Sequence, residues 1–323
     1  MIDWPVVRGG IRGRRPTIGN LRRGRRGSEI LTKDSLLGTR AVSELQQEAD
    51  YTILQKLMLN LVQSQSGRPI NIRDSWLNDA QTIARKMFEH LASLRALTDV
   101  HRVEINETQS FCFIDHSSVK VVARAAFETY LVFFFIFAGS DLSRCEFRHK
   151  IWRYGGLADR QRPHPVNPEA RKVQAADKAE MDRLKPEIEA SPHLGAYGRD
   201  AVKKILRGEW RGGDSWAGLA GRAGFHESYF RDVYGYLCGY SHASYISAMQ
   251  VGQARSLDEQ RKLAKACIGL GLVLMAHFAR AYTDLFVDSK RILDADGQAK
   301  ASVDRWCFSA EDWEKMTAKK SSS

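Results

Sequence analysis

The stretch YLVFFFIFAG, residues 130–139, is the strongest apolar run in the sequence and constrains the fold more than any other feature. A helix needs about twenty apolar residues to cross a bilayer, and this run is only half that long. Two charged residues, Arg124 and Glu128, come shortly before it. We therefore predict that residues 116–138 form a helix buried in a protein core, and not a membrane span.

Apolar residues recur at helical spacing along most of the chain. One stripe, spaced three or four residues apart, comprises Trp76, Ala80, Ile83, Met87, Leu91 and Leu94. The same period predicts further helices at 40–65, 141–160, 197–208, 226–241 and 256–287. No stretch of convincing length alternates apolar and polar residues as a strand does. The fold class that follows is all-α, a multi-helix bundle.

Capping residues mark where several of these helices begin. Ser140 is the expected N-cap of the helix that follows it. Asn167 with Pro168 after it predicts the start of a helix that is charged nearly all round, and Pro186 predicts its bend or end. A Ser-x-x-Asp pattern at 309–312 predicts a short terminal helix.

The sequence divides into three regions. Residues 1–28 are predicted to form a disordered basic arm, residues 29–290 a helical bundle domain, and residues 291–323 a C-terminal tail with a short helix. The stretch RPHPVNP at 162–168 interrupts the helical pattern, either as a loop or as a division of the bundle into halves.

Positive charge is concentrated in the arm. The chain has a formal net charge of +11, and residues 5–28 contain no Asp or Glu. The arginines of this segment are Arg8, Arg12, Arg14, Arg15, Arg22, Arg23, Arg25 and Arg26. Because the rest of the chain is nearly balanced, we predict that Arg8–Arg26 bind nucleic acid weakly and without sequence preference.

Cysteine spacing and the N-terminal composition bear on location. The chain has five cysteines, and no two of them fit a Cys-x-x-Cys spacing. This indicates reduced thiols, and neither a disulfide framework nor a zinc site. Residues 1–30 lack the apolar segment of a secretory signal. We expect a cytoplasmic protein that needs no metal or cofactor.

A polar stripe runs along the most apolar helix. His116, Lys120, Arg124 and Glu128 recur every four residues and therefore share one face. Arg124 and Glu128 enter a region that is otherwise apolar, where a charge must be paired or functional. The two either form a structural ion pair that fixes the register of the helix, or line a polar pocket inside the bundle.

A second polar group lies in RHKIWRYGGLADRQRPH, residues 148–164. Arg148 and Trp152 are one helical turn apart and share a face, and Arg160 follows two turns later. A phosphate or carboxylate ligand would suit such a surface. A solvated basic face is the structural alternative.

Two histidine motifs resemble catalytic signatures. Arg144…His149 and Arg95…His101 match the Arg-x(4–6)-His ribonuclease signature of the HEPN superfamily, but roughly three such matches are expected by chance in a chain with this many arginines. Glu146-x-x-His149 has the spacing of a di-iron ligand pair, yet a di-iron bundle needs two copies and the sequence has one.

Residues 216–233, WAGLAGRAGFHESYFRDV, follow the pattern of a helix-turn-helix motif. Ala220 would pack between the two helices, and Gly224 would make the turn. The recognition helix would be strongly aromatic, with Arg231 as its only basic residue. A tight turn between two core helices is the structural alternative.

Three segments, in this order, carry a resemblance to a known family: RAAFETYLVFFFIF, IWRYGGLADR and the run from Trp216 to His242. Over roughly residues 45–285 the chain resembles a family of bacterial helical proteins, domain-of-unknown-function family 5677. The shared positions are Arg124, Glu128, Trp152, Arg160, Trp216, Gly224, Tyr229, Tyr236 or Tyr240, and His242. The resemblance implies a helical fold in which such polar residues converge, and it implies no reaction.

His242 is the candidate on which the site depends. The residues expected to meet around it are Arg124, Glu128, Arg160, Tyr236 and Tyr240. Glu128 would hold His242 by a hydrogen bond and raise the pKa of its imidazole. Such a pair is either an acid–base catalyst or a polar contact that fastens helices together. In both cases we expect His242 to lie deep between helices.

Three functions remain open at this point. The first is a ligand-binding or interaction module with a nucleic-acid-binding arm, the second a HEPN-like ribonuclease or defence toxin, and the third a helix-turn-helix DNA-binding regulator. A sealed cluster around His242 favours the first, an open pocket there favours the second, and an exposed basic face at 226–233 favours the third.

Overall fold

A computed structural model describes residues 42–68 and 71–318, and the predicted arm at 1–28 lies outside them. The described chain is almost entirely helical, so the predicted all-α class is confirmed. In chain order its α-helices are α2 (Glu44–Gln63), α3 (Asn78–Ala96), α4 (His116–Phe137), α5 (Leu142–Gln161), α6 (Pro168–Glu189), α7 (Arg199–Ile205), α8 (Trp216–Arg222), α9 (Glu227–Ser241), α10 (Tyr245–Gln253), α11 (Leu257–Leu285), α12 (Val287–Ala295), α13 (Gly297–Trp306) and α14 (Ala310–Ala318). Two 3-10 helices, η1 (Ile72–Leu77) and η2 (Pro192–Ala196), precede α3 and α7.

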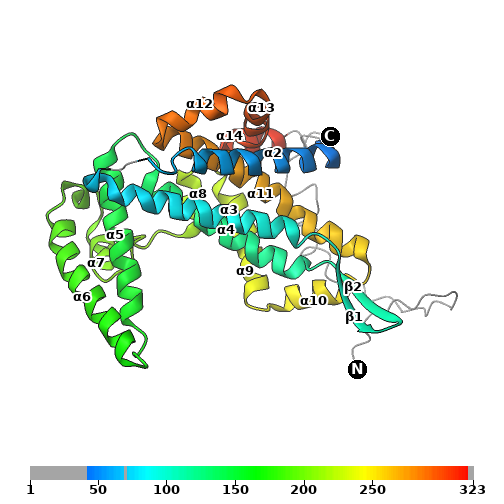
Figure 1. The fold of residues 1–323 in the computed structure, drawn as a ribbon, viewed down its shortest axis with the longest axis horizontal. Coiled ribbons are helices and arrows are strands. Elements are labelled where there is room, and N and C mark those ends of the chain that lie inside the picture. The colour runs from blue at the N-terminus through cyan, green and yellow to red at the C-terminus, as the bar shows by residue number, and fades with distance from the viewer. Residues whose placement is uncertain (1–41, 69–70, 319–323) are drawn as a thin grey trace.

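Helix α4 is the centre of the core, as the apolar run predicted. It packs against α3, α11 and α9, while α2 covers α3 and α11. Phe133 shows how tightly the centre is filled, because its ring centroid lies 5.0 Å from that of Phe278 and 5.2 Å from that of Phe137. Figure 1 shows these long helices side by side, with α5, α6 and α7 projecting from one end.

Among the described helices, α11 is the one whose length and apolar composition would allow it to cross a membrane. However, 83% of its most apolar window is buried inside the protein. A core helix of a folded domain has the same composition, and the contacts of α11 with α2, α4 and α13 account for its apolar surface.

One small sheet was not predicted. β1 (His101–Asn106) pairs with β2 (Gln109–Phe113) in an antiparallel hairpin. Its outward residues include Val103 and Ile105, both exposed. Because two short strands with half of their apolar residues in solvent give only a weak alternating pattern, the hairpin is hard to recognise in the sequence.

The lobe at the end of the body is a helical hairpin of α5 and α6 (Figure 1). The break predicted at 162–168 is the loop between them, and Asn167 caps α6 as predicted by accepting a hydrogen bond from the Ala170 amide. One expectation was wrong, because Asp141, and not Ser140, caps α5. Of the two alternatives for Pro186, a bend or an end of α6, the end is excluded, because α6 continues to Glu189.

Residues 291–306 belong to the helical body, so their assignment to a C-terminal tail was wrong. Helix α13 packs on α2 and α11 through buried residues that include Val303 and Trp306. The predicted Ser-x-x-Asp cap is confirmed, because Ser309 and Asp312 exchange hydrogen bonds at the start of α14.

Candidate functional site

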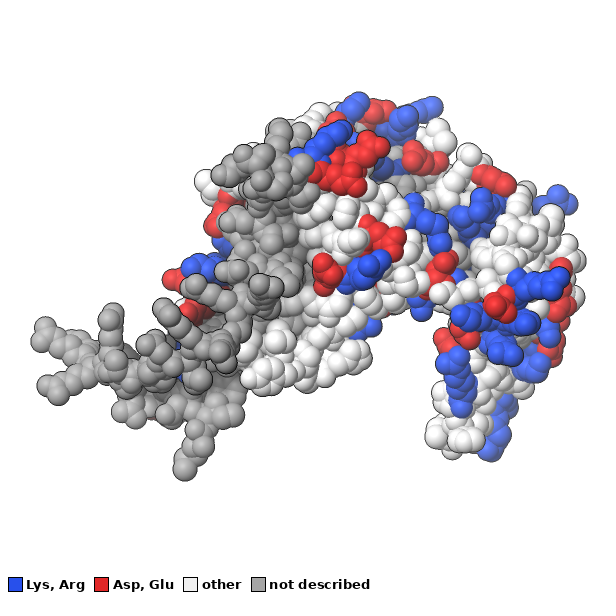
Figure 2. Space-filling view, turned by 180° about the vertical axis from the view of Figure 1, so that it is seen from behind, with Lys and Arg blue, Asp and Glu red and all other residues white. Residues whose placement is uncertain are grey.

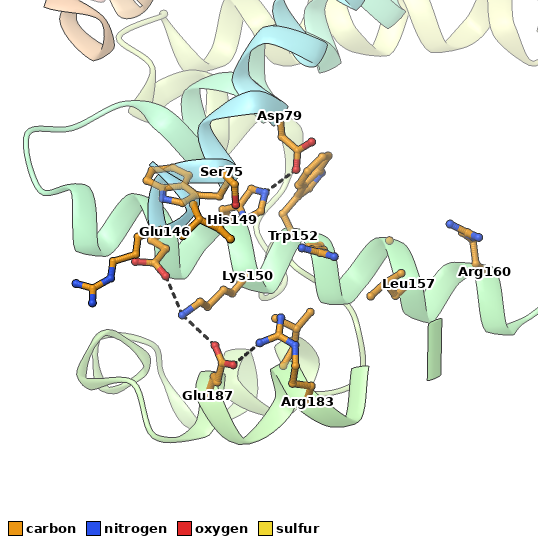
Figure 3. Close-up of a pocket in the computed structure, with 16 residues that line it drawn as sticks. Ser75, Asp79, Glu146, His149, Lys150, Trp152, Leu157, Arg160, Arg183 and Glu187 are labelled. Carbon is orange, nitrogen blue, oxygen red and sulfur yellow. Dashed lines mark hydrogen bonds and ion pairs between the residues drawn. The ribbon is translucent and has the colours of Figure 1, made fainter. Parts of the chain in front are cut away.

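The largest cavity described is an open cleft of about 810 Å³ at the base of the projecting lobe. We call it the α5–α6 cleft. Its walls come from η1 and the first turn of α3, from one face of α5, and from the last turns of α6. The polar residues that line it, most of them labelled in Figure 3, are Arg73, Ser75, Asp79, Glu146, His149, Lys150, Arg153, Arg160, Arg183 and Glu187.

A histidine–aspartate pair lies at the centre of the cleft wall. The Nε2 atom of His149 is 2.7 Å from the Oδ2 atom of Asp79 (Figure 3). The His149 side chain is only 4% exposed, while that of Asp79 is 43% exposed. Because the carboxylate fixes one ring nitrogen, it holds the imidazole in one orientation, as in the acid–base pairs of many enzymes.

Two indole rings contact His149. The centroids of the Trp76 and Trp152 rings each lie 5.8 Å from that of His149. Trp76 is also stacked on Phe137 at 5.8 Å, so the end of the core helix α4 supports it. The cleft therefore combines flat aromatic surface with hydrogen-bonding groups, a combination common in ligand pockets.

Ion pairs form the opposite wall. The Nζ atom of Lys150 lies 2.9 Å from a carboxylate oxygen of Glu146 and 3.1 Å from one of Glu187. Arg183 pairs with the same Glu187. Burial alone would lower the pKa of Lys150, but its bonds to the two carboxylates outweigh burial and raise that pKa, so Lys150 stays cationic.

The charges of the cleft lining do not cancel. Five cationic side chains and three carboxylates line it, which leaves an excess of two positive charges. Figure 2 shows Lys and Arg gathered with Asp and Glu over this lobe. Two of the five cations, Arg153 and Arg160, pair with the carboxylates of Glu180 and Asp177, which lie outside the lining.

A family model matches one continuous segment of the chain, and most of the residues that line the cleft lie in that segment. Residues 114–260 match DUF5677, a family of unknown function. The predicted resemblance to this family is thus confirmed for residues 114–260, a shorter span than the 45–285 expected. Neither a curated protein nor a solved structure matches the chain significantly.

The DUF5677 segment supplies α5 and α6, and with them His149 and the ion-pair wall. Asp79 and Trp76 lie before that segment, on α3 and η1. The cleft is therefore completed by a part of the chain that the family match does not cover.

Two of the sequence-predicted binding residues, Trp152 and Arg160, line the cleft. Arg160 is held by Asp177 of α6, with 3.0 Å between Nε and Oδ2. Arg148 lies elsewhere: its guanidinium donates to the Ala138 carbonyl at the end of α4 and stacks on the Phe135 ring. Arg148 thus joins α5 to α4 and is not among the residues that line the cleft.

The predicted contact between Arg124 and Glu128 is confirmed, with Nε 2.9 Å from Oε1. Tyr234 of α9 completes the group by donating its hydroxyl to the same Oε1 at 2.7 Å and by lying under the Arg124 guanidinium. The two charged side chains remain 23% and 27% exposed. They border the surface and are not the deeply buried pair that was expected.

The placement of His242 was wrong. It is the C-cap of α9, and its side chain is exposed. No contact with Arg124, Glu128 or Arg160 occurs among the described residues. The reason is geometric: the face of α9 that meets α4 carries Phe230, Val233 and Leu237, and the helix ends before His242 can turn towards that face.

Tyr236 and Tyr240 form a cluster of their own around Lys120. Both hydroxyls donate to the side-chain oxygen of Gln250, at 2.9 Å for Tyr236. The Lys120 ammonium lies 4.4 Å from the Tyr240 ring centroid. Neither tyrosine is among the residues that line the α5–α6 cleft, so the two belong to a cluster apart from it.

Sequence reasoning missed Asp79, Trp76 and Lys150 as site residues. Trp76 was recognised only as part of an apolar stripe, and Asp79 is an ordinary first-turn acid of α3. No local pattern connects Asp79 with His149, because 70 residues separate them. No group of three His, Cys, Asp or Glu side chains suited to a metal occurs in the part of the chain that the structure describes.

Proposed function

We propose that the α5–α6 cleft binds a small phosphorylated ligand that carries an aromatic ring, the chemistry of a nucleotide. The observation that carries the proposal is the pair of indoles, Trp76 and Trp152, which contact His149 in a cleft with excess positive charge. Indoles provide stacking surface for a flat ring, and guanidinium groups match the oxygens of a phosphate.

The ion-pair wall supports the anionic half of this ligand. The carboxylate of Glu187 lies between Lys150 and Arg183 and forms an ion pair with each of them. This arrangement is what a bound anion would require, so a ligand phosphate can take over these two donors. Arg153 on the neighbouring turn adds a third cation that is 48% exposed and lies 3.1 Å from a carboxylate oxygen of Glu180.

The proposal predicts that Trp152→Ala weakens nucleotide binding about tenfold, because stacking one base on an aromatic side chain contributes about 1–3 kcal/mol. Isothermal titration calorimetry with GMP measures the effect. Trp152→Phe, which keeps a ring, should retain most of the affinity. Lys178→Ala serves as a charge control, because Lys178 lies on α6 and pairs with Asp182 outside the cleft. Equal GMP affinity in Trp152→Ala and the unaltered protein would contradict the proposal.

The Asp79–His149 pair favours a second function, proton transfer to or from the bound ligand. The HEPN-type motif adds no support for a ribonuclease, because Arg144 is exposed and, like Arg95, does not line the cleft. Chromatography of nucleotides after incubation with the protein tests whether the cleft catalyses a reaction. Conversion that His149→Gln abolishes supports the second function, and unchanged nucleotides refute it.

A DNA-binding role of α8 and α9 is not favoured. Gly224 makes the predicted turn with a φ of 87°. However, the exposed positions of α9 include Glu227, Arg231 and Asp232, and Arg231 is paired with Glu227. A phosphate backbone would meet more negative than positive charge on this surface.

We propose a separate, nonspecific contact with nucleic acid through the Arg-rich residues 5–28, which lie outside the described residues. Eight arginines without an acidic neighbour can neutralise several phosphates, so binding should fall steeply with salt. Deleting residues 1–28 should remove most of the DNA and RNA binding at low salt while leaving the melting temperature nearly unchanged. Fluorescence anisotropy with labelled oligonucleotides tests this, and undiminished binding by the truncated protein would refute it.

A further inference from the structure

Trp152 also lines a second cavity, of about 320 Å³. It is a pocket between α3 and α4, and we call it the α3–α4 pocket. The side chains of Trp152 and Trp216 both line it, together with His90, Lys86 and Glu128. Trp152 also lines the α5–α6 cleft, so the two cavities share its indole as a common wall.

One face of α3 connects the two cavities. Asp79, which lines the cleft, is followed at helical spacing by Ile83, Lys86 and His90, which line the pocket. At about 1.5 Å per residue this row is about 16 Å long.

The pocket contains polar atoms without a described partner. The Nε2 atom of His90 is buried and has no hydrogen-bond partner in the described chain. Burial and the nearby Lys86 lower the pKa of His90, which keeps its imidazole neutral. The described hydrogen bonds of Glu128, from Arg124 and Tyr234, both go to Oε1. A buried ring nitrogen without a partner costs free energy, and a ligand that bonds to it recovers that cost.

We propose that the α3–α4 pocket, and not the Trp76 side of the cleft, binds the base of the nucleotide whose phosphate lies in the α5–α6 cleft; this rests on the phosphate binding and the Trp152 stacking proposed above. The base would lie between the indoles of Trp152 and Trp216. Glu128 Oε2 would accept a hydrogen bond from an amino or imino group on the edge of the base, and His90 Nε2 would bond to a second edge atom. Carboxylates and imidazoles recognise base edges in this way.

Arg124 and Tyr234 act as positioning residues in this arrangement. They bond to Oε1 of Glu128, and no hydrogen bond to Oε2 is described. This gives the partly exposed Arg124–Glu128 pair a role that a purely structural ion pair would not need.

Calorimetry with GMP and with ribose 5-phosphate, which has a phosphate but no base, tests the inference. We expect GMP to bind at least tenfold more tightly than ribose 5-phosphate, since the base adds its stacking contribution. His90→Ala and Glu128→Gln should each reduce GMP affinity towards that of ribose 5-phosphate while leaving the sugar phosphate unaffected. Arg85→Ala, an exposed change on α3 outside both cavities, is the matched control, and melting curves verify folding.

Other results separate this inference from the proposed function. Equal affinities for GMP and ribose 5-phosphate, both reduced by Arg153→Ala, would overturn the inference and keep the phosphate site. A GMP preference that Trp152→Ala removes but His90→Ala and Glu128→Gln do not would place the base in the cleft and also overturn it. If neither compound binds, both proposals fall.

Discussion

Replacing Asp50 with alanine is expected to destabilise the protein by about 3–5 kcal/mol, the cost of breaking a buried ion pair from one side. Asp50 is on α2 and is 0% exposed. Its carboxylate accepts hydrogen bonds from Gln46, Ser302, Arg305 and Trp306. Three of these donors are on α13, so the Asp50 side chain attaches the C-terminal helices to the body. Replacing it leaves all four donors without their acceptor.

Chemical denaturation followed by circular dichroism measures this effect. Asp99→Ala is the matched control, because Asp99 is largely exposed and lies 3.8 Å from its partner Arg95. Exposed ion pairs contribute about 0–1 kcal/mol, so the control should change stability little. A loss below 1 kcal/mol for Asp50→Ala would show that α13 does not depend on this carboxylate.

The same carboxylate makes stability depend on pH. Burial alone would raise the pKa of Asp50, but the bonds from Trp306, Arg305, Ser302 and Gln46 together outweigh it and hold that pKa below its ordinary value of 3.8. The stabilisation is therefore complete above the pKa of the unfolded chain and is lost as the pH falls through the lower folded-state value. Asp50→Asn should lack this part of the acid dependence.

The fold could be predicted from the sequence wherever the signal was local. The apolar run at 130–139 indicated the central helix, and Asn167 and Ser309 marked helix starts that the structure confirms. Arg124 and Glu128 were paired correctly because a spacing of four residues brings side chains together on any helix. Short elements with little burial, such as the hairpin of β1 and β2, gave too weak a pattern.

The candidate site depended on contacts that no local pattern contains. His149 was noticed in two motifs, one expected by chance and one lacking its second copy, yet its partner is Asp79 on another helix. His242 was expected to be buried because its neighbours are aromatic, but those neighbours face Lys120 and Gln250. Where a helix ends decides which way its last side chain points, and a single sequence fixes such ends only to within a few residues.

Lys120 differs from Asp50 in that its buried charge has no partner of opposite sign among the described residues. It is 1% exposed and makes no ion pair with a carboxylate in the described chain. Its ammonium donates to the His116 carbonyl at 3.0 Å and lies over the Tyr240 ring. Burial lowers the pKa of Lys120 from 10.5 to about 8, although the more distant Cys267 and Asp115 raise it somewhat. The His116 imidazole beside it has a pKa lowered to about 4, first by burial and then by Lys120.

This depressed pKa means that the charged lysine opposes folding. Between pH 8 and about 10.5 the unfolded chain binds more protons at this position than the folded one, so stability rises with pH across that window. Below pH 8 the full cost is present. At about 1.4 kcal/mol for each pKa unit it amounts to roughly 3 kcal/mol at pH 7.

Lys120→Met should therefore stabilise the protein at pH 7 by up to about 3 kcal/mol, because methionine fills a similar volume without a charge to desolvate. Unfolding by urea at a series of pH values measures it. The advantage of the variant should shrink between pH 8 and 10.5, where the unaltered lysine loses its proton on folding. Lys178→Met, at an exposed site on α6, should show neither the gain nor the pH trend. A Lys120→Met variant that is less stable than the unaltered protein at pH 7 would show that the carbonyl and tyrosine contacts of the ammonium outweigh its burial.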